Sequence, residues 1–206
     1  MLLPVSPRSM LIATLRRNGV GAEIGVYEGD FSDDLLRGAK PATLHLIDPW
    51  FCSDAPEHAP AWYGAHKSTQ SEMDKIYAGV QHRFKGYIAR GRVVVHRATS
   101  EQALRDMPDD SLDWIYIDGD HTYNGAILDL RMALSKVKAG GLICGNDYTL
   151  GHWWEDGVVR AVHEFLQENN GKLALKLVMG TEFAIERIAA ASAAAVSPRP
   201  PAELEL

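Results

Sequence analysis

The sequence predicts an α/β fold in which a mostly parallel, seven-stranded sheet carries helices on both faces. Along the chain, short apolar runs rich in β-branched residues alternate with longer amphipathic stretches, and this alternation is typical of a parallel sheet covered by helices. The last two apolar runs depart from this pattern, because only Gly180 and Thr181 separate them. Two residues are too few for a crossover helix, so the sheet is expected to end in an antiparallel hairpin.

Each strand is assigned to one apolar run, and we expect the strands, in chain order, near residues 22–26, 43–48, 92–97, 113–118, 141–145, 172–179 and 181–187. Between the fourth and fifth strands, apolar residues recur at helical spacing over residues 123–137. Lys136, Lys138 and Gly140 are expected to close this helix with a basic last turn and a glycine stop. The same spacing predicts a second helix over residues 158–166.

Residues 49–69 interrupt the alternation. They contain three prolines and a group of aromatic and histidine side chains with no regular period. Such an insert is either a lid over a substrate or a loop packed down for structural reasons. We favour the lid, because ligands of open α/β sheets bind beyond the carboxyl ends of the strands, and this insert begins where the second strand ends.

Length and composition indicate one soluble globular domain. At 206 residues, with 46% hydrophobic and 23% charged residues, the chain suits a single full-sized core. We expect this domain to span residues 1–188. Residues 189–206 are mostly alanine, serine and proline, a composition that builds no packed core, so they are expected to be a disordered tail.

Charge and cysteine content exclude several classes of partner and site. The formal net charge of −6 leaves no basic field for the phosphates of a nucleic acid. No apolar stretch approaches the ~20 residues needed to cross a membrane. Cys52 and Cys144 form no C-x-x-C pattern, and Cys52 with His58 and His66 matches no zinc spacing. A reducing, cytoplasmic location is therefore expected, with Cys144 buried in the core.

A glycine turn follows the first expected strand. Gly25 and Gly29 stand four residues apart, Glu23 precedes them, and Ser32 follows where a helix is expected to begin. A strand, a glycine turn and a helix in this order typically bind a nucleotide-type cofactor. A dinucleotide pyrophosphate would favour G-x-G-x-x-G, which this turn lacks. A cofactor without phosphates therefore fits better, and a nicotinamide-dependent oxidoreductase is the less favoured alternative.

Four sequence elements occur in an order that resembles a known family. They are Glu23-x-Gly25-x-x-x-Gly29 with Phe31-Ser32, then Leu46-Ile47-Asp48, then residues 113–123, and then residues 140–148. Together they resemble the class I S-adenosylmethionine-dependent methyltransferases, above all the branch with macrocin and related sugar O-methyltransferases, and more distantly catechol O-methyltransferase. The resemblance extends from about residue 20 to residue 188. It implies the Rossmann-like fold of that class, in which a C-terminal antiparallel hairpin closes the sheet.

The resemblance implies that S-adenosylmethionine is the cofactor, and it assigns to that cofactor a binding set of Glu23, Gly25, Tyr27, Gly29, Ser32, Asp48 and Asp118. Within this set, Asp48 would hold the ribose diol and Glu23 would lie near the methionine end. The residues alone leave alternatives open, because Asp48 precedes Pro49 and suits a turn, and Glu23 suits a helix cap or a salt bridge. An extra residue, Asp30, separates the glycine turn from Phe31-Ser32, and Ser32 is otherwise suited to cap the next helix.

Polar side chains gather after the fourth and fifth strands. Asp118, Asp120 and His121 follow the fourth strand, and Asn146 and Asp147 follow the fifth. The resemblance gives Asp118, Asn146 and Asp147 as ligands of Mg²⁺, and their oxygen donors suit that ion. His121 or Asp120 is expected to be the general base. His121 could instead line the adenine pocket, and Asp120 could be a second oxygen ligand or form an Asx turn before the next helix.

The sequence therefore predicts a methyltransferase that methylates a hydroxyl of a small molecule, such as a sugar or a phenolic natural product, with help from Mg²⁺. A vicinal diol could chelate such an ion, which favours O-methylation. The alternative is a non-catalytic module that binds S-adenosylmethionine. Trp153 and Trp154 either stack on the acceptor or brace the last helix. No membrane partner is expected, and the resemblance leaves a homo-oligomer open, because related enzymes often form dimers.

Overall fold

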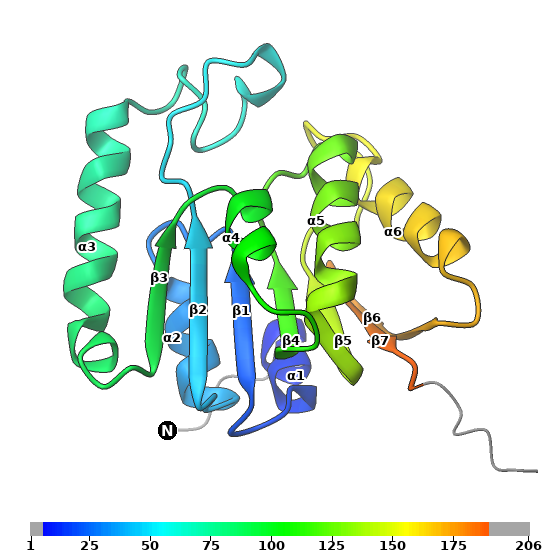
Figure 1. Cartoon of the computed structure of the whole chain (residues 1–206). Helices are drawn as coiled ribbons and strands as arrows, with labels where there is room; N and C mark the ends of the chain where they lie inside the picture. Colours follow the sequence, from blue (N-terminus) through cyan, green and yellow to red (C-terminus); the bar gives the residue numbers. More distant parts are fainter. Residues whose placement is uncertain (1–5, 190–206) are drawn as a thin grey trace, which may run out of the picture.

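A parallel sheet with an antiparallel end organises the molecule (Figure 1). The computed structural model describes residues 6–189, so residues 190–206 of the expected tail lie outside the described residues. The strands are β1 (Val20–Ile24), β2 (Thr43–Asp48), β3 (Val93–Arg97), β4 (Leu112–Ile117), β5 (Val137–Gly145), β6 (Leu173–Met179) and β7 (Glu182–Arg187). Their order in the sheet is β3-β2-β1-β4-β5-β7-β6, with β7 antiparallel to both neighbours. The predicted fold class and the C-terminal hairpin are confirmed.

Helices cover both faces of the sheet. Within residues 6–189 they are α1 (Pro7–Thr14), α2 (Asp30–Gly38), α3 (Gln70–Ile88), α4 (Ser100–Asp106), α5 (Tyr123–Lys136) and α6 (Gly157–Glu168). One core cluster joins α1, α2 and α3 to one face, and a second joins α4, α5 and α6 to the other. Trp114 and Ile115 are neighbours on β4 and reach one cluster each, because successive side chains of a strand point to opposite faces. None of these helices has the length and apolar character needed to cross a membrane.

β1 lies two residues earlier than the sequence predicts. It spans Val20–Ile24 rather than residues 22–26. Gly25 follows with φ +83°, in the left-handed region that favours glycine. Because this backbone turns the chain out of the sheet, Val26 belongs to the turn and not to the strand.

β5 also begins earlier than predicted, at Val137 rather than near residue 141. Val137 has an extended backbone (φ −81°, ψ 129°), is buried, and pairs with Leu112 of β4. Lys138 and Gly140 therefore lie in the strand, and the expectation that they close α5 is wrong. Sheet pairing overrides the helical spacing that continues through Val137 in the sequence. The buried position expected for Cys144, further along β5, is confirmed.

The insert of residues 49–69 rises beyond the carboxyl end of β2 (Figure 1). Its only regular element is a short 3₁₀ helix, Pro56–His58. Its two arms meet where Ser53 N–H donates to the Tyr63 carbonyl (2.8 Å) and Ala65 N–H donates to the Ser53 carbonyl (2.8 Å). The insert is thus a closed loop, and whether it moves as a lid stays a prediction.

Candidate active site

A cavity of about 580 Å³ lies between the insert and the carboxyl ends of β1, β2 and β4. Parallel strands present their carboxyl ends at one edge of the sheet, which is where ligands of such sheets bind. Five residues of the predicted cofactor set line this cavity, namely Glu23, Gly25, Tyr27, Asp48 and Asp118. Gly29 and Ser32 of the same set do not.

The glycine turn brings the ends of β1 and β4 into backbone contact. A Cβ atom on Gly25 would lie 1.9 Å from the carbonyl oxygen of Asp118, so no side chain fits at this position. Gly29, with φ +79°, is the N-cap residue of α2, and a Cβ there would lie 2.7 Å from the ring of Phe84. Gly25 therefore opens the cavity wall, whereas Gly29 shapes the turn behind it.

Asp48 fastens this turn to the end of β2. Its Oδ2 accepts hydrogen bonds from the backbone N–H groups of Val26 (3.0 Å) and Tyr27 (2.9 Å), and its Oδ1 accepts one from Trp50 N–H (2.7 Å). Burial raises the pKa of Asp48, and these three donors oppose that shift. The bond to Trp50 is an Asx turn, so the turn-forming interpretation of Asp48 is correct, and the same carboxyl also faces the cavity.

Glu23 is a buried carboxyl group at the end of β1. Only 1% of the residue is exposed, and burial raises its pKa to about 8. Ser32 Oγ donates a hydrogen bond of 2.5 Å to Glu23 Oε2. The suggestion that Ser32 caps α2 is wrong, because Gly29 holds the N-cap position and Ser32 lies inside the helix. Ser32 instead supports Glu23 from behind the cavity wall.

Arg8 is a site residue that sequence reasoning missed. It lies on α1 and lines the cavity, with Nη2 2.9 Å from Asp118 Oδ2 and Nε 3.1 Å from Glu182 Oε1. Its guanidinium stacks 4.8 Å from the ring centre of Phe31. Tyr116 O–H donates to Glu182 (2.8 Å), so α1, β4 and β7 meet around one arginine. No local pattern around Arg8 pointed to this role.

Asp118, His121 and Asp147 converge at the ends of β4 and β5. One ligand atom from each lies within 4.8 Å of the others. His121 Nε2 is 3.3 Å from Asp118 Oδ1 and 3.2 Å from Asp147 Oδ2, but both ring nitrogens are buried without a hydrogen bond of good geometry. Burial opposes a charge on His121, yet the two carboxylates raise its pKa above the usual value. A buried nitrogen facing two carboxylates has the donor chemistry of a divalent-cation site.

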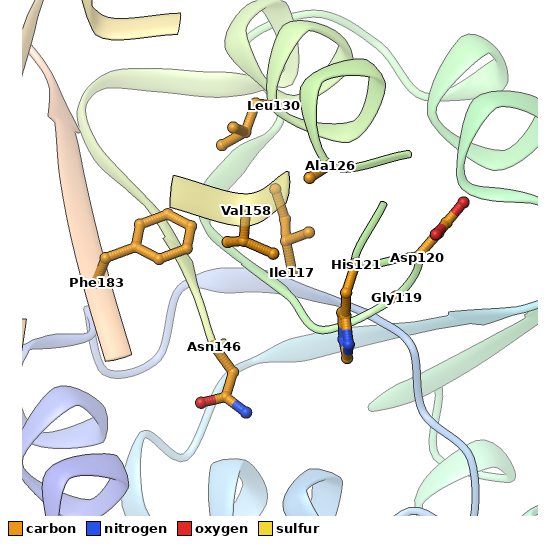
Figure 2. Close-up of a pocket in the computed structure, with 9 residues that line it drawn as sticks. All are labelled: Ile117, Gly119, Asp120, His121, Ala126, Leu130, Asn146, Val158 and Phe183. Atoms are coloured by element: carbon orange, nitrogen blue, oxygen red, sulfur yellow. The ribbon is translucent and has the colours of Figure 1, made fainter. Parts of the chain in front are cut away.

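Asn146, the third predicted metal ligand, follows β5 next to Asp147. Its Oδ1 accepts a hydrogen bond from Thr181 Oγ1 (2.7 Å). Together with His121, Val158 and Phe183 it lines a small void of about 10 Å³ (Figure 2). The structure thus brings the imidazole of His121 to the two carboxylates, and the role of Asn146 as a ligand stays a prediction.

Asp120 turns away from His121, although the two are neighbours in the chain (Figure 2). Its Oδ1 accepts a hydrogen bond from Thr122 N–H (2.9 Å), which confirms an Asx turn before α5. Its Oδ2 lies 3.2 Å from His58 Nε2 of the insert, and His58 Nδ1 lies 2.8 Å from Ser53 Oγ. Sequence reasoning considered His58 only as a zinc ligand, because 62 positions separate it from Asp120.

Asp129 is a second buried acid on the cavity wall. It lies on α5, and burial raises its pKa to about 7. Ser100 Oγ donates a hydrogen bond to it, and both residues line the cavity. The sequence did not indicate either residue as part of the site, because Ser100 and Asp129 each lie within a helix and belong to no recognisable motif.

Trp153 and Trp154 do not line the cavity. Trp154 packs against the core cluster that includes α6, and its ring stands edge-on to His121 at 4.8 Å between centroids. These contacts support the structural brace over the acceptor-stacking alternative.

Comparison with known proteins gives the family. A family model described as a methyltransferase domain matches residues 22–148. The chain belongs to this methyltransferase family. The matched segment begins in β1 and ends beyond β5, so it contains the glycine turn, Asp48, the Asp118–His121 turn and Asp147.

Individual relatives of this methyltransferase-domain protein are distant. An uncharacterized protein of Acanthamoeba polyphaga mimivirus is 25% identical over 149 residues, which is 71% of this chain and 58% of that protein. The chain thus matches less than two thirds of this relative's length.

Solved structures share the fold at low sequence identity. A Clostridium thermocellum protein assigned as an rRNA methylase has a TM-score of 0.60 at 13% identity, covering 91% of this chain and 99% of that one. A Streptococcus mutans protein assigned as a methyltransferase and solved with SAH has a TM-score of 0.59 at 10% identity, with coverages of 90% and 100%. A precorrin-6y C5,15-methyltransferase of Geobacter metallireducens has a TM-score of 0.54 at 17% identity, covering 86% of this chain and 82% of that one. The architecture is that of class I methyltransferases.

Proposed function

We propose that this protein uses S-adenosylmethionine to methylate a hydroxyl of a small molecule such as a sugar or a phenol. The observation that carries the proposal is the cavity itself, where the side-chain-free Gly25 turn, Asp48 and Glu23 meet at the carboxyl ends of β1 and β2. Family membership supports the methyl transfer. The SAH complex of the Streptococcus mutans neighbour supports the choice of cofactor.

The cavity suits the parts of S-adenosylmethionine. Close backbone at Gly25 accommodates the sulfonium and amino-acid portion, Asp48 is available to accept the ribose hydroxyls, and Glu23 lies near the cationic ammonium in this arrangement. Burial of Glu23 favours its partnership with a positive group, because the ligand's charge would offset the desolvation of the carboxylate.

The insert suits a small, ring-shaped acceptor. Phe51, Trp62 and Tyr63 line the cavity from this side, and aromatic faces stack well on sugar and phenolic rings. The volume of about 580 Å³ is within the range of small-molecule sites. The net charge of −6 argues against a nucleic acid as the acceptor.

The reaction is an in-line displacement in which the acceptor oxygen forms a bond to the methyl carbon while the sulfur–methyl bond breaks and its electron pair returns to sulfur. The protein's task is to align the two reactants and exclude water. Asp118 and Asp147 lie near the expected position of the transferred methyl group, and Arg8 balances the charge of Asp118.

A divalent cation fits the residues at the ends of β4 and β5. Asp118, His121 and Asp147 would hold it. When bound, it would lower the pKa of an acceptor hydroxyl. The nitrogen of His121 extends the choice from Mg²⁺, the predicted ion, to transition metals such as Mn²⁺. Chelation is expected to reduce methyl transfer, and added Mg²⁺ or Mn²⁺ to restore it, while S-adenosylmethionine affinity stays unchanged.

Calorimetric titration tests the cofactor. The purified protein is titrated with S-adenosylmethionine and, in parallel, with NAD⁺, each with and without Mg²⁺. Selective binding of S-adenosylmethionine is expected. Binding of NAD⁺ alone, or of neither, would overturn the proposal. The acceptor class is then tested by following SAH release with catechol, simple phenols and methyl glycosides.

A further inference from the structure

A chain of polar contacts links the insert to the end of β4 across the cavity. Ser53 Oγ lies 2.8 Å from His58 Nδ1, and His58 Nε2 lies 3.2 Å from Asp120 Oδ2. All three residues line the cavity. The contact between His58 and Asp120 connects the insert directly to the turn after β4, next to Asp118 and His121.

Hydrogen-bond chemistry determines which atom donates in each contact between Ser53, His58 and Asp120. A carboxylate only accepts, so the proton on His58 lies on Nε2 and Nδ1 is the basic nitrogen. Nδ1 therefore accepts from the Ser53 hydroxyl. Asp120 is immobilised on its other side by Thr122 N–H. The imidazole is thus held with its free electron pair toward Ser53.

A glycine makes room for the carboxylate that holds the imidazole. A Cβ atom on Gly125, in the first turn of α5, would lie 2.4 Å from Asp120 Cγ. The carboxyl group can pack against the helix only because this side chain is missing. Tyr63 closes the other side, with its ring edge-on to His58 at 5.2 Å between centroids.

His121 is less suited to accept a proton from the substrate. Its Nε2 faces the carboxylate oxygens of Asp118 and Asp147 at 3.3 and 3.2 Å. This nitrogen therefore points toward two carboxylates rather than toward a hydroxyl. His58 has one carboxylate on one side and a neutral hydroxyl on the other. The geometry of a base, its orienting carboxylate and a proton donor is found at His58.

We propose that Ser53, His58 and Asp120 form a proton relay that deprotonates the acceptor hydroxyl during methyl transfer. This inference depends on the proposed function. As the acceptor oxygen bonds to the methyl carbon, its proton passes to Ser53 Oγ, and the Ser53 proton passes to His58 Nδ1. Asp120 stabilises the resulting imidazolium at Nε2. The positive charge lost by the sulfonium is thus balanced by the one gained on His58, and Ser53 ends unchanged.

The test compares two acceptors that differ in their need for a base. Catechol must lose a proton during the reaction, whereas 4-nitrocatechol is already ionised at neutral pH. His58→Gln is expected to lower kcat with catechol by about 100-fold or more and to leave kcat with 4-nitrocatechol within about threefold of the unmodified protein. Asp120→Asn is expected to lower kcat with catechol by a smaller factor and likewise to leave kcat with 4-nitrocatechol nearly unchanged. The matched control is His66→Gln, an exposed histidine of the same insert that does not line the cavity.

The outcomes separate the relay from the proposed function. His58→Gln with unchanged rates on both acceptors overturns the relay, and so does an equal loss on both, which would make His58 a structural residue. Titration with S-adenosylmethionine and the unfolding temperature are measured for every variant, and both are expected to match the unmodified protein. If the unmodified protein binds S-adenosylmethionine but methylates none of the catechols, simple phenols and methyl glycosides, the proposed acceptor class fails and the relay fails with it.

Discussion

The two sides of the cavity are built in different ways. On the strand side, backbone contacts hold the site residues in place: Gly25 lies against the end of β4, and Asp48 accepts hydrogen bonds from three backbone N–H groups. On the insert side, Trp62 is 72% exposed and Phe51 59% exposed, and a single short 3₁₀ turn gives the only regular structure. A site on the rigid side tolerates little change, whereas the insert can vary without disturbing the sheet. We infer that the strand side binds the cofactor and that the insert is needed to bind the acceptor.

The largest effect is expected on the strand side, at Gly25. Gly25→Ala places a Cβ 1.9 Å from the Asp118 carbonyl at φ +83°, so the ends of β1 and β4 must separate. S-adenosylmethionine affinity, measured by calorimetry, is expected to fall by about 100-fold or more, with a lower unfolding temperature. The control is Gly79→Ala on α3, where a Cβ meets nothing within 4 Å. Unchanged affinity in Gly25→Ala would show that the turn does not bind the cofactor.

A smaller effect, confined to the acceptor, is expected on the insert side. Trp62→Ala removes an exposed ring from the cavity wall, and its loss is expected to raise the acceptor KM by about fivefold, in line with about 1 kcal/mol for aromatic stacking. Cofactor affinity and unfolding temperature should not change. Leu150→Ala, 66% exposed and away from the cavity, is the control. Weaker cofactor binding by Trp62→Ala would contradict the division between the two sides.

The smallest effect concerns the pH dependence of stability. Burial raises the pKa of Glu23 to about 8 from an ordinary value of 4.5, so the folded protein binds more protons than the unfolded chain between these values. This stabilisation is complete below about pH 4.5 and is lost as the pH rises through about 8. The unfolding temperature of the ligand-free protein is therefore expected to fall as the pH rises through this window.

In Glu23→Gln, the fall in unfolding temperature across this pH range should be several degrees smaller than in the unmodified protein. Glu28→Gln, at an exposed residue, is the control. Asp129, whose pKa is raised to about 7, contributes to the same window, so Glu23→Gln should remove only part of the slope. Identical profiles for Glu23→Gln and the unmodified protein would place the titrating group elsewhere.

The sequence predicted the strand side well, because its signals are local. The glycine turn, the acidic residue at a strand end and the two-residue hairpin connection are each formed by residues only a few positions apart. The boundaries were less predictable, since sheet pairing made Val137 a strand residue despite its helical spacing. The starts of α1, α3 and α4 carried a usable signal, because each begins with a capping box.

The insert side and Arg8 could not be predicted in this way. His58 meets Asp120 across 62 positions, and Arg8 meets Glu182 across 174. Contacts of this kind depend on how the chain returns to the same place in space, which no local pattern encodes. The same applies to His121, whose approach to the carboxylates of Asp118 and Asp147 no local pattern indicated.

The most direct test of this division is a cofactor titration on a protein with a shortened insert. Residues 54–63 are replaced with a short Gly-Ser linker, since Ser53 and Gly64 already lie side by side in a β-bridge. We expect S-adenosylmethionine to bind this variant within about tenfold of its affinity for the full protein, while methyl transfer to catechol is lost. Loss of S-adenosylmethionine binding in a variant with an unchanged unfolding temperature would contradict the account, because the insert would then be part of the cofactor site.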